Sequence, residues 1–221
     1  MNFRKTSYKS YSDYHHNITQ NTYDKFVLEY AEMWEWNKKT YKEIIKNNII
    51  PFCKFCKQGG KILIAGCGTG RDYKILSEKG FSCLGIDYSK SMLDEAKRRT
   101  NGNFLRMDVK DYFSKDQYDG IYCESAITHL SKKNARLVLS NFFKNLTNEG
   151  ILYAAVKIGE PGIYVSDDLG GKRYYLIHDK DKFCKLVNNT GFDIIETIVS
   201  DHTDVNRPKW LSIVARKKTK K

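Results

Sequence analysis

The residues whose types could do chemistry begin with three glycines at alternate positions, Gly66, Gly68 and Gly70, directly after the apolar run 62–65. Glycines at this spacing let the backbone turn sharply and approach a ligand with no Cβ in between, at the start of the next helix. Asp87 closes a second apolar run 21 residues after the first of these glycines, where a ribose-binding acid is expected. The pattern predicts a loop for a nucleotide-type cofactor.

The position of the third glycine distinguishes between kinds of cofactor. A dinucleotide fingerprint reads Gly-x-Gly-x-x-Gly, but here Arg71 stands where the last glycine would be. This spacing disfavours NAD. A further acid, Asp108, ends the short apolar segment 104–107, 21 residues after Asp87. The glycines and the two acids therefore follow three successive predicted strands.

Together these pieces resemble the class I (Rossmann-like) S-adenosylmethionine-dependent methyltransferases, of the type that acts on small molecules. The matching segments are GCGTGRD at 66–72, GIDYSKSMLDEAK at 85–97, MD at 107–108 and YDGIYCESAITHL at 118–130. The resemblance covers about residues 61–157 and implies that S-adenosyl-L-methionine is the cofactor.

The resemblance also implies which residues bind the cofactor. Asp87 would accept hydrogen bonds from both ribose hydroxyls, Asp108 would accept from the adenine amino group, and the backbone N–H of Val109 would face an adenine ring nitrogen. The full set expected around the cofactor is Tyr23, Tyr30, Gly66, Cys67, Gly68, Gly70, Arg71, Asp87, Tyr88, Asp108, Val109 and Glu124.

Two positions leave undecided which groups bind the amino-acid end of the cofactor. Similar enzymes carry an acid two residues before the first glycine, and this chain has Ile64 there. Either backbone carbonyls around Gly66 and Glu124 take the cofactor's amino group, or affinity is lower. Arg71 could pair bidentately with the cofactor carboxylate, or it could form salt bridges on the helix surface.

The candidates for a catalytic base are His129 and Tyr122. Methyl transfer from a sulfonium is an in-line displacement, so alignment of the acceptor supplies much of the acceleration and a base is needed only for a protonated acceptor. His129 follows the fourth predicted strand and has a suitable ordinary pKa, although such a histidine can equally pack or cap a helix. Tyr122, Glu124 and His178 are weaker candidates than His129, and Tyr122 could simply belong to the core.

Alternating patterns predict the elements that must position these residues. Strands are expected at about 61–65, 82–86, 103–107, 118–123 and 150–157, with helices near 70–79, 89–99 and 132–146 between them. This alternation predicts an α/β fold with a doubly wound, mostly parallel sheet. A helix at about 179–189 and strands at about 192–199 and 209–216 follow, and the resemblance implies seven strands with the last one antiparallel.

Outside that core, residues 1–58 are expected to form an N-terminal helical cap or lid on the Rossmann-like domain of residues 59–221. Apolar spacing predicts helices over 22–36 and about 41–55, the second broken or kinked at Pro51. In related enzymes Tyr23-Asp24 and Tyr30 lie over the cofactor, although they could also be packing residues. The more N-terminal Tyr11, Tyr14, His15 and His16 could form a mobile lid, but disorder is the commoner state of a terminus.

Glycines and a proline punctuate the chain after Lys157. They predict an insertion at about 158–175 that loops over the cofactor edge of the sheet and covers the substrate, with a short strand resuming at 173–176. Such an insertion suits a small-molecule acceptor.

Composition predicts one domain in the cytosol, with no membrane partner. A chain of 221 residues is long enough to bury roughly 70% of its unfolded surface without disulfides or metals. No apolar run approaches the roughly 20 residues of a membrane span. Cys53 and Cys56 look like half of a zinc site, but no second pair at metal spacing follows, so no metal is expected. The sequence gives no indication of oligomeric state.

The net charge of +12 raises the alternative of an RNA methyltransferase, because clustered cations bind phosphates. The lysines are scattered, however, and the one true run, 216–221, is typical of a solvated, frayed end. The fourth-strand motif at 123–126 reads Cys-Glu-Ser-Ala rather than the Asn/Asp-Pro-Pro-aromatic loop of enzymes that act on base amines. We therefore expect transfer to an oxygen or nitrogen of a small molecule, with RNA as the alternative and a non-catalytic or NAD-dependent protein as the least favoured reading.

Overall fold

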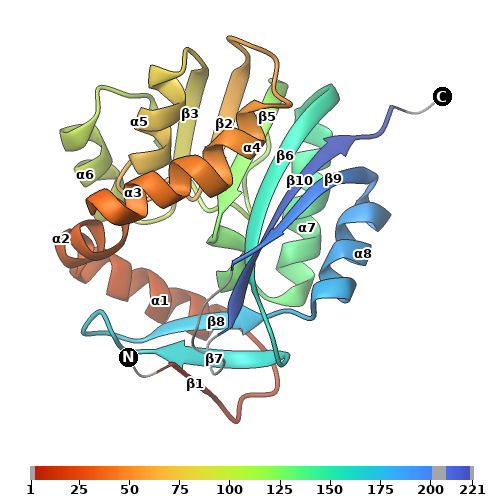
Figure 1. Ribbon diagram of the computed structural model, residues 1–221. Coiled ribbons are helices and arrows are strands. Elements are labelled where there is room, and N and C mark those ends of the chain that lie inside the picture. Colours follow the sequence, from red (N-terminus) through yellow and green to blue (C-terminus); the bar gives the residue numbers. More distant parts are fainter. Residues whose placement is uncertain (1–2, 201–207, 220–221) are drawn as a thin grey trace.

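A computed structural model describes residues 3–200 and 208–219. Its larger sheet has seven strands in the order β4-β3-β2-β5-β6-β10-β9 (Figure 1). The strands are β2 (Lys61–Ala65), β3 (Ser82–Asp87), β4 (Phe104–Arg106), β5 (Tyr118–Glu124), β6 (Leu146–Ile158), β9 (Phe192–Val199) and β10 (Lys209–Lys217). Only β10 runs antiparallel to its neighbours, β6 and β9. The predicted α/β fold class, with a mostly parallel sheet of seven strands and an antiparallel last strand, is confirmed.

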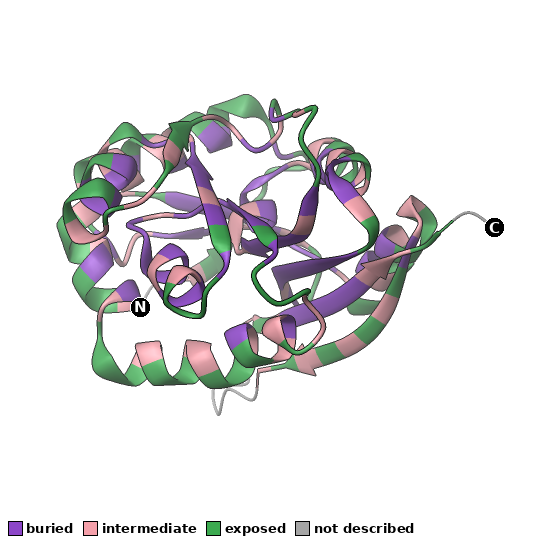
Figure 2. Cartoon of the chain, turned by 90° about the horizontal axis from the view of Figure 1, so that it is seen from above, coloured by how far each residue is buried: buried purple, intermediate pink, exposed green. Residues whose placement is uncertain are grey.

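Helices cover both faces of this sheet because its central strands are apolar on both sides. Along β2, Leu63 packs with α7 (Lys132–Asn145) and α8 (Lys180–Thr190). Ile62 and Ile64 point to the opposite face, which α5 (Arg71–Glu78) and α6 (Lys90–Arg99) cover. Figure 2 shows the result from above, with buried strands inside and helices whose outer surfaces are exposed.

The N-terminal segment is helical, as expected, but its boundaries differ from the prediction. The helix expected over 22–36 begins nine residues earlier, as α1 (Asp13–Lys25), and continues through α2 (Val27–Tyr30) and the π-helical turn η1 (Ala31–Glu35). The backbone N–H of Ser12 donates to Nδ1 of His15 at 3.1 Å, which fixes the start of α1. The expectation of a disordered terminus was wrong, because His15 and His16 lie buried on this helix.

The second predicted helix is divided into α3 (Lys38–Ile44), the π-helical turn η2 (Ile45–Ile49) and α4 (Ile50–Cys53). Pro51 lies in the first turn of α4, where no intrahelical N–H is required, so the expected interruption takes the form of a π-helical turn before it. Ile49 and Phe52 pack into the core beside Ile62. Residues 38–53 therefore also pack on the sheet.

A second, antiparallel sheet joins β1 (Phe3–Lys5), β7 (Gly162–Ser166) and β8 (Arg173–Ile177), and α1 lies against it (Figure 1). The insertion expected at 158–175 therefore contains a strand, β7, that the turn residues did not reveal, and its hairpin extends to residue 177. Phe3 pairs with Ser166, so the beginning of the chain completes the sheet formed by the insertion.

No helix within the described ranges has the length and apolarity that crossing a bilayer requires. The expected basic run at 216–221 is described up to Thr219. It is not a frayed end there, because β10 reaches Lys217, Arg216 lies 3.7 Å from Glu149 and Lys218 lies 2.8 Å from Asp193. Lys220 and Lys221 lie outside the described residues.

Candidate cofactor and acceptor site

The loop between β2 and α5 has a backbone that only glycine adopts without strain. Gly66 and Gly68 have φ of 77° and 53°, in the left-handed region. A Cβ at Gly66 would lie 2.7 Å from the Cβ of Ala126, and one at Gly68 would collide with Glu35. The N–H groups of Gly66 and Cys67 donate to the Ile86 carbonyl, which anchors the loop beside β3. Glycine at these positions lets neighbouring groups approach the backbone closely, as the sequence predicted.

Asp87, at the end of β3, is buried beside this loop. Its Oδ2 accepts from the N–H of Gly68 at 3.0 Å, and its Oδ1 accepts from the N–H of Ser89 at 3.0 Å. Burial raises the pKa of Asp87 to about 6, although these backbone donors oppose the shift. Each carboxylate oxygen keeps a second lone pair, so Asp87 can still accept from ribose hydroxyls.

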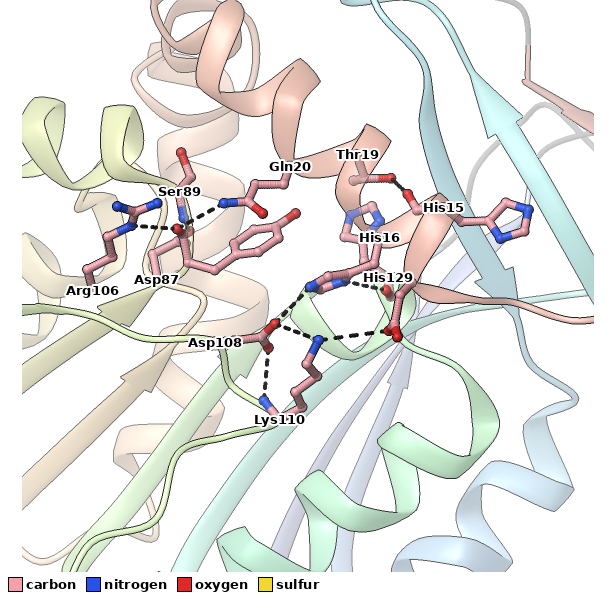
Figure 3. Close-up of polar contacts among 12 residues, drawn as sticks. His15, His16, Thr19, Gln20, Asp87, Ser89, Arg106, Asp108, Lys110 and His129 are labelled. Carbon is pink, nitrogen blue, oxygen red and sulfur yellow. Dashed lines mark hydrogen bonds and ion pairs between the residues drawn. The ribbon is translucent and has the colours of Figure 1, made fainter.

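Asp108 follows β4 and is held by a histidine and a lysine. Its Oδ2 lies 2.9 Å from Nε2 of His16 and 3.2 Å from Nζ of Lys110 (Figure 3). Burial alone would raise the pKa of Asp108, but the His16 and Lys110 contacts outweigh it and leave the pKa lowered. His16 was not expected to touch a cofactor residue. The sequence feature that could have indicated this is the seven-residue spacing between His16 and Tyr23, which places both side chains on one face of α1.

Tyr88 follows Asp87 in the chain and has a buried hydroxyl with no hydrogen-bond partner among the described residues. Its ring lies 4.8 Å from the ring of His16. Val109, directly after Asp108, is buried, as is Cys67 in the glycine loop, where burial raises the pKa of the thiol. A buried hydroxyl without a partner suits a polar ligand such as adenosine.

Arg71 is buried at the start of α5 rather than exposed on a helix surface, so that reading of it was wrong. Its Nε and Nη2 donate to the two oxygens of Asp72 at 2.8 and 2.9 Å. Nη2 also lies 3.6 Å from Oε2 of Glu124. Glu124, at the end of β5, accepts from the Tyr122 hydroxyl at 2.7 Å and from Asn48 at 2.9 Å.

Glu35 is a site residue that the sequence did not single out. It comes from η1, and its buried carboxylate reaches the glycine loop, where Oε2 accepts from the N–H of Thr69 at 3.0 Å and from the Thr69 hydroxyl. Burial raises the pKa of Glu35 to about 7, against the opposing effect of Arg71. No spacing rule links residue 35 to residue 69, because the docking of η1 on the loop is a tertiary contact.

A second group of side chains lies beside the cofactor residues. His129 ends the short 3-10 helix η3 (Ala126–His129), and its ring is 4.7 Å from that of Tyr175 in β8. The Tyr23 hydroxyl lies 3.1 Å from Nε2 of His129, and the rings of Tyr23 and Tyr30 meet edge to face at 5.2 Å. The chain therefore brings Tyr23, Tyr30 and His129 together from separate elements.

Tyr122 and His178 lie away from this group. Tyr122 is fully buried, stacks on Tyr153 with ring centroids 4.5 Å apart, and has its hydroxyl engaged by Glu124. His178 packs on Phe183 of α8. Asp24, next to Tyr23, accepts from the Ser89 hydroxyl and so docks α1 on α6. The structure describes no cluster of three or more His, Cys, Asp or Glu residues suited to a metal ion.

Comparison with known proteins agrees with this geometry. Residues 62–150 match the family model described as Methyltransferase domain. The protein YqeM of Bacillus subtilis (strain 168) is 34% identical over 112 residues, which cover 46% of this chain and 45% of YqeM. The 18S rRNA (guanine-N(7))-methyltransferase of Bos taurus is 36% identical over 78 residues, which cover 34% of this chain and 28% of that enzyme. The chain spans less than half the length of either curated relative.

A solved structure extends the likeness to the whole fold. The Burkholderia thailandensis 1,6-didemethyltoxoflavin-N1-methyltransferase, with 1,6-didemethyltoxoflavin and S-adenosylhomocysteine bound, superposes with a TM-score of 0.77 and 14% identity, covering 98% of this chain and 95% of that one. The family match begins at the strand that leads into the glycine loop, and the superposed fold continues it through the antiparallel β10. Residues 62–150 therefore match a methyltransferase domain, and the chain as a whole has the fold of an S-adenosylmethionine-dependent methyltransferase.

Proposed function

We propose that the chain transfers a methyl group to an oxygen or nitrogen of a small-molecule acceptor. The methyl group comes from the sulfonium of S-adenosylmethionine. Asp87 accepts from the ribose, Asp108 from the adenine amino group, and the backbone of Gly66 and Gly68 admits the methionine part. Tyr23, Tyr30 and His129 border the acceptor and hold it in line with the transferred carbon, which is where most of the acceleration arises.

The observation that supports a small acceptor is the enclosure of this acceptor side. The sheet β1-β7-β8 and the helix α1 lie against each other beside the cofactor residues, and Tyr11, Tyr174 and Leu176 form a small apolar core between them. His129 and Tyr175 are both buried beneath this cover. A site roofed by a sheet and a helix admits a molecule of limited size, whereas a folded RNA needs an open, positively charged surface.

The net charge remains the argument for RNA, and one relative acts on 18S rRNA by its name. Two of the cations in the C-terminal run are, however, engaged with acids of this chain, Arg216 with Glu149 and Lys218 with Asp193. Cations that are already paired with acids of the chain bind a phosphate backbone less strongly. The enclosed acceptor side therefore favours the small-molecule reading.

The test is transfer of a radiolabelled methyl group from S-adenosylmethionine to a fractionated small-molecule extract and, in parallel, to total RNA. We expect label in one or a few small-molecule fractions. An Asp87→Asn variant should lose the label, which controls for contaminating enzymes. Label that enters RNA alone would overturn the small-molecule assignment, and absence of S-adenosylhomocysteine binding would overturn the reaction itself.

A further inference from the structure

The position two residues before the first glycine carries no acid in this chain. Ile64 is 1% exposed and packs among Ile49, Tyr122 and Tyr153 in the core. A carboxylate there would be buried among apolar groups without a partner, which costs several kcal/mol. Any carboxylate for the cofactor's amino group must therefore come from another element.

Glu35 is placed to be that carboxylate. Its Oε1 lies so close to Gly68 that a Cβ on that residue could not fit, and it is therefore directly over the loop that borders the methionine part. The hydrogen bonds within the described residues reach only its other oxygen, Oε2, from Thr69. Oε1 thus keeps both lone pairs for a donor above the glycine loop.

The charges around Glu35 also favour a cationic ligand. The carboxylates of Glu35, Asp72 and Glu124 lie near a single guanidinium, that of Arg71, which Asp72 already engages with both oxygens. Glu124 in turn accepts from Tyr122 and Asn48 as well as facing Arg71. Among the described residues Glu35 accepts only from Thr69 and, unlike Asp72 and Glu124, lies in no ion pair with Arg71, so an ammonium group would neutralise it.

We infer that Glu35 binds the amino group of the S-adenosylmethionine, so that the N-terminal cap supplies the acid that the strand end lacks. This inference rests on the proposed function. It has a structural consequence, because η1 carries Glu35 while α1, on the same segment, carries Tyr23 and His16. Cofactor binding would then hold the cap in place and complete the acceptor side of the site.

The test measures binding with three ligands, by calorimetry. S-adenosylhomocysteine has the amino group, 5′-S-(3-carboxypropyl)-5′-thioadenosine lacks only that group, and 5′-methylthioadenosine lacks the whole amino-acid part. The wild-type chain should bind the first about 10- to 100-fold more tightly than the second, as expected for one charge-assisted hydrogen bond. Glu35→Gln should abolish this preference and leave the affinity for 5′-methylthioadenosine unchanged.

Glu32→Gln is the matched control, because Glu32 is an exposed acid on the same π-helical turn. It should behave as the wild type. If Glu35→Gln weakened all three ligands equally, Glu35 would only anchor the cap on Thr69 and the inference would be wrong. It would also be wrong if the variant kept the wild-type preference. A wild-type chain that binds none of the three ligands would instead overturn the proposed function.

Discussion

The hydroxyl of Tyr23 donates to Nε2 of His129 across 3.1 Å, and this fixes how the histidine can act. Nδ1 of the same ring lies 2.6 Å from the Tyr174 carbonyl, which can only accept, so Nδ1 carries the proton. Burial lowers the pKa of His129 to about 3, despite the opposing effect of that carbonyl. The ring is therefore neutral near pH 7, and its one Nε2 lone pair accepts from Tyr23, so His129 reaches an acceptor through that hydroxyl.

We expect Tyr23→Phe to lower turnover by up to about tenfold, because it removes one hydrogen bond on the acceptor side. His129→Ala should lower turnover at least as much. Affinity for S-adenosylhomocysteine should stay within about twofold in both, since neither contacts Asp87 or Asp108. Methyl transfer to the accepting fraction, with calorimetry beside it, measures both quantities. Unchanged turnover in His129→Ala would show that the histidine contributes to packing and not to catalysis.

The same pKa predicts the shape of the pH profile. A group that titrates at about 3 changes no charge between pH 5 and 8, so turnover at saturating ligand should show no inflection from His129 in that range. An inflection near pH 6.5 that disappears in His129→Ala would show that the histidine titrates as an exposed imidazole does, and would contradict its burial.

Asp87→Asn should weaken S-adenosylhomocysteine and 5′-methylthioadenosine equally, by about 10- to 100-fold, because both ligands carry the ribose. This uniform loss contrasts with the selective loss expected for Glu35→Gln. Asp94→Asn is a suitable control, since Asp94 is an exposed acid on α6 that pairs with Lys90. Calorimetric affinities that do not differ between Asp87→Asn and the control would remove Asp87 from the site.

The part of the site that the sequence predicted lies on β2 to β5, where local patterns determine the structure. Apolar runs that end in Gly66, Asp87 or Glu124 must bring these residues to the same edge of a parallel sheet. Their identification needed no knowledge of the rest of the chain. The helices α5, α6 and α7 were likewise predicted to within a few residues, because each has a periodic apolar face and, for α6 and α7, a serine cap.

The contacts that the N-terminal segment makes with the rest of the fold could not be predicted in this way. β1 pairs with β7 across about 160 residues, and neither strand is long enough to carry a clear alternating pattern. His16 and Glu35 reach Asp108 and Thr69 only after α1 and η1 dock on the sheet. Such contacts depend on tertiary packing: the spacing of His16 from Tyr23 gives it a helix face but not the partner of that face, and no spacing indicates Glu35 at all.

Two hydrogen bonds to the side chain of Asp24 should account for much of the docking of α1. Oδ1 of Asp24 accepts from the Ser89 hydroxyl at 2.6 Å and from the N–H of Ser91 at 3.1 Å, so α1 caps the first turn of α6. Asp24→Ala should cost about 1 kcal/mol of unfolding free energy, as loss of a helix cap does, and lower Tm by about 2–4 °C. Glu29→Ala, at an exposed site on α2, should leave Tm unchanged. Equal Tm values in a thermal scan of the two variants would show that the N-terminal segment docks without these Asp24 hydrogen bonds.

Glu35 predicts how the stability of the ligand-free chain depends on pH. A carboxyl whose pKa is about 7 when folded, against an ordinary 4.5, binds its proton more tightly in the folded state. Its contribution is fully present below about pH 4.5 and is lost as the pH rises through 7. The groups that act on it are Arg71, Asp72 and Thr69. Glu35→Gln mimics the protonated form, so its Tm should exceed that of the wild type by more at pH 8 than at pH 5.5. A difference that does not change with pH would show that Glu35 titrates normally.

Ligand binding should show the opposite trend, because an ammonium group binds the ionised carboxylate. Affinity for S-adenosylhomocysteine should rise on the order of tenfold between pH 5.5 and 7.5 as Glu35 loses its proton. Asp87, whose pKa is about 6, titrates in the same range but faces the ribose that all the ligands share. The analogue without the amino group therefore isolates the effect of Glu35. Over the same pH range, the affinity for this analogue should rise about tenfold less than the affinity for S-adenosylhomocysteine. Glu35→Gln should give the two ligands the same pH dependence, and calorimetry at each pH measures it. Parallel curves for the two ligands in the wild type would show that no carboxylate recognises the amino group.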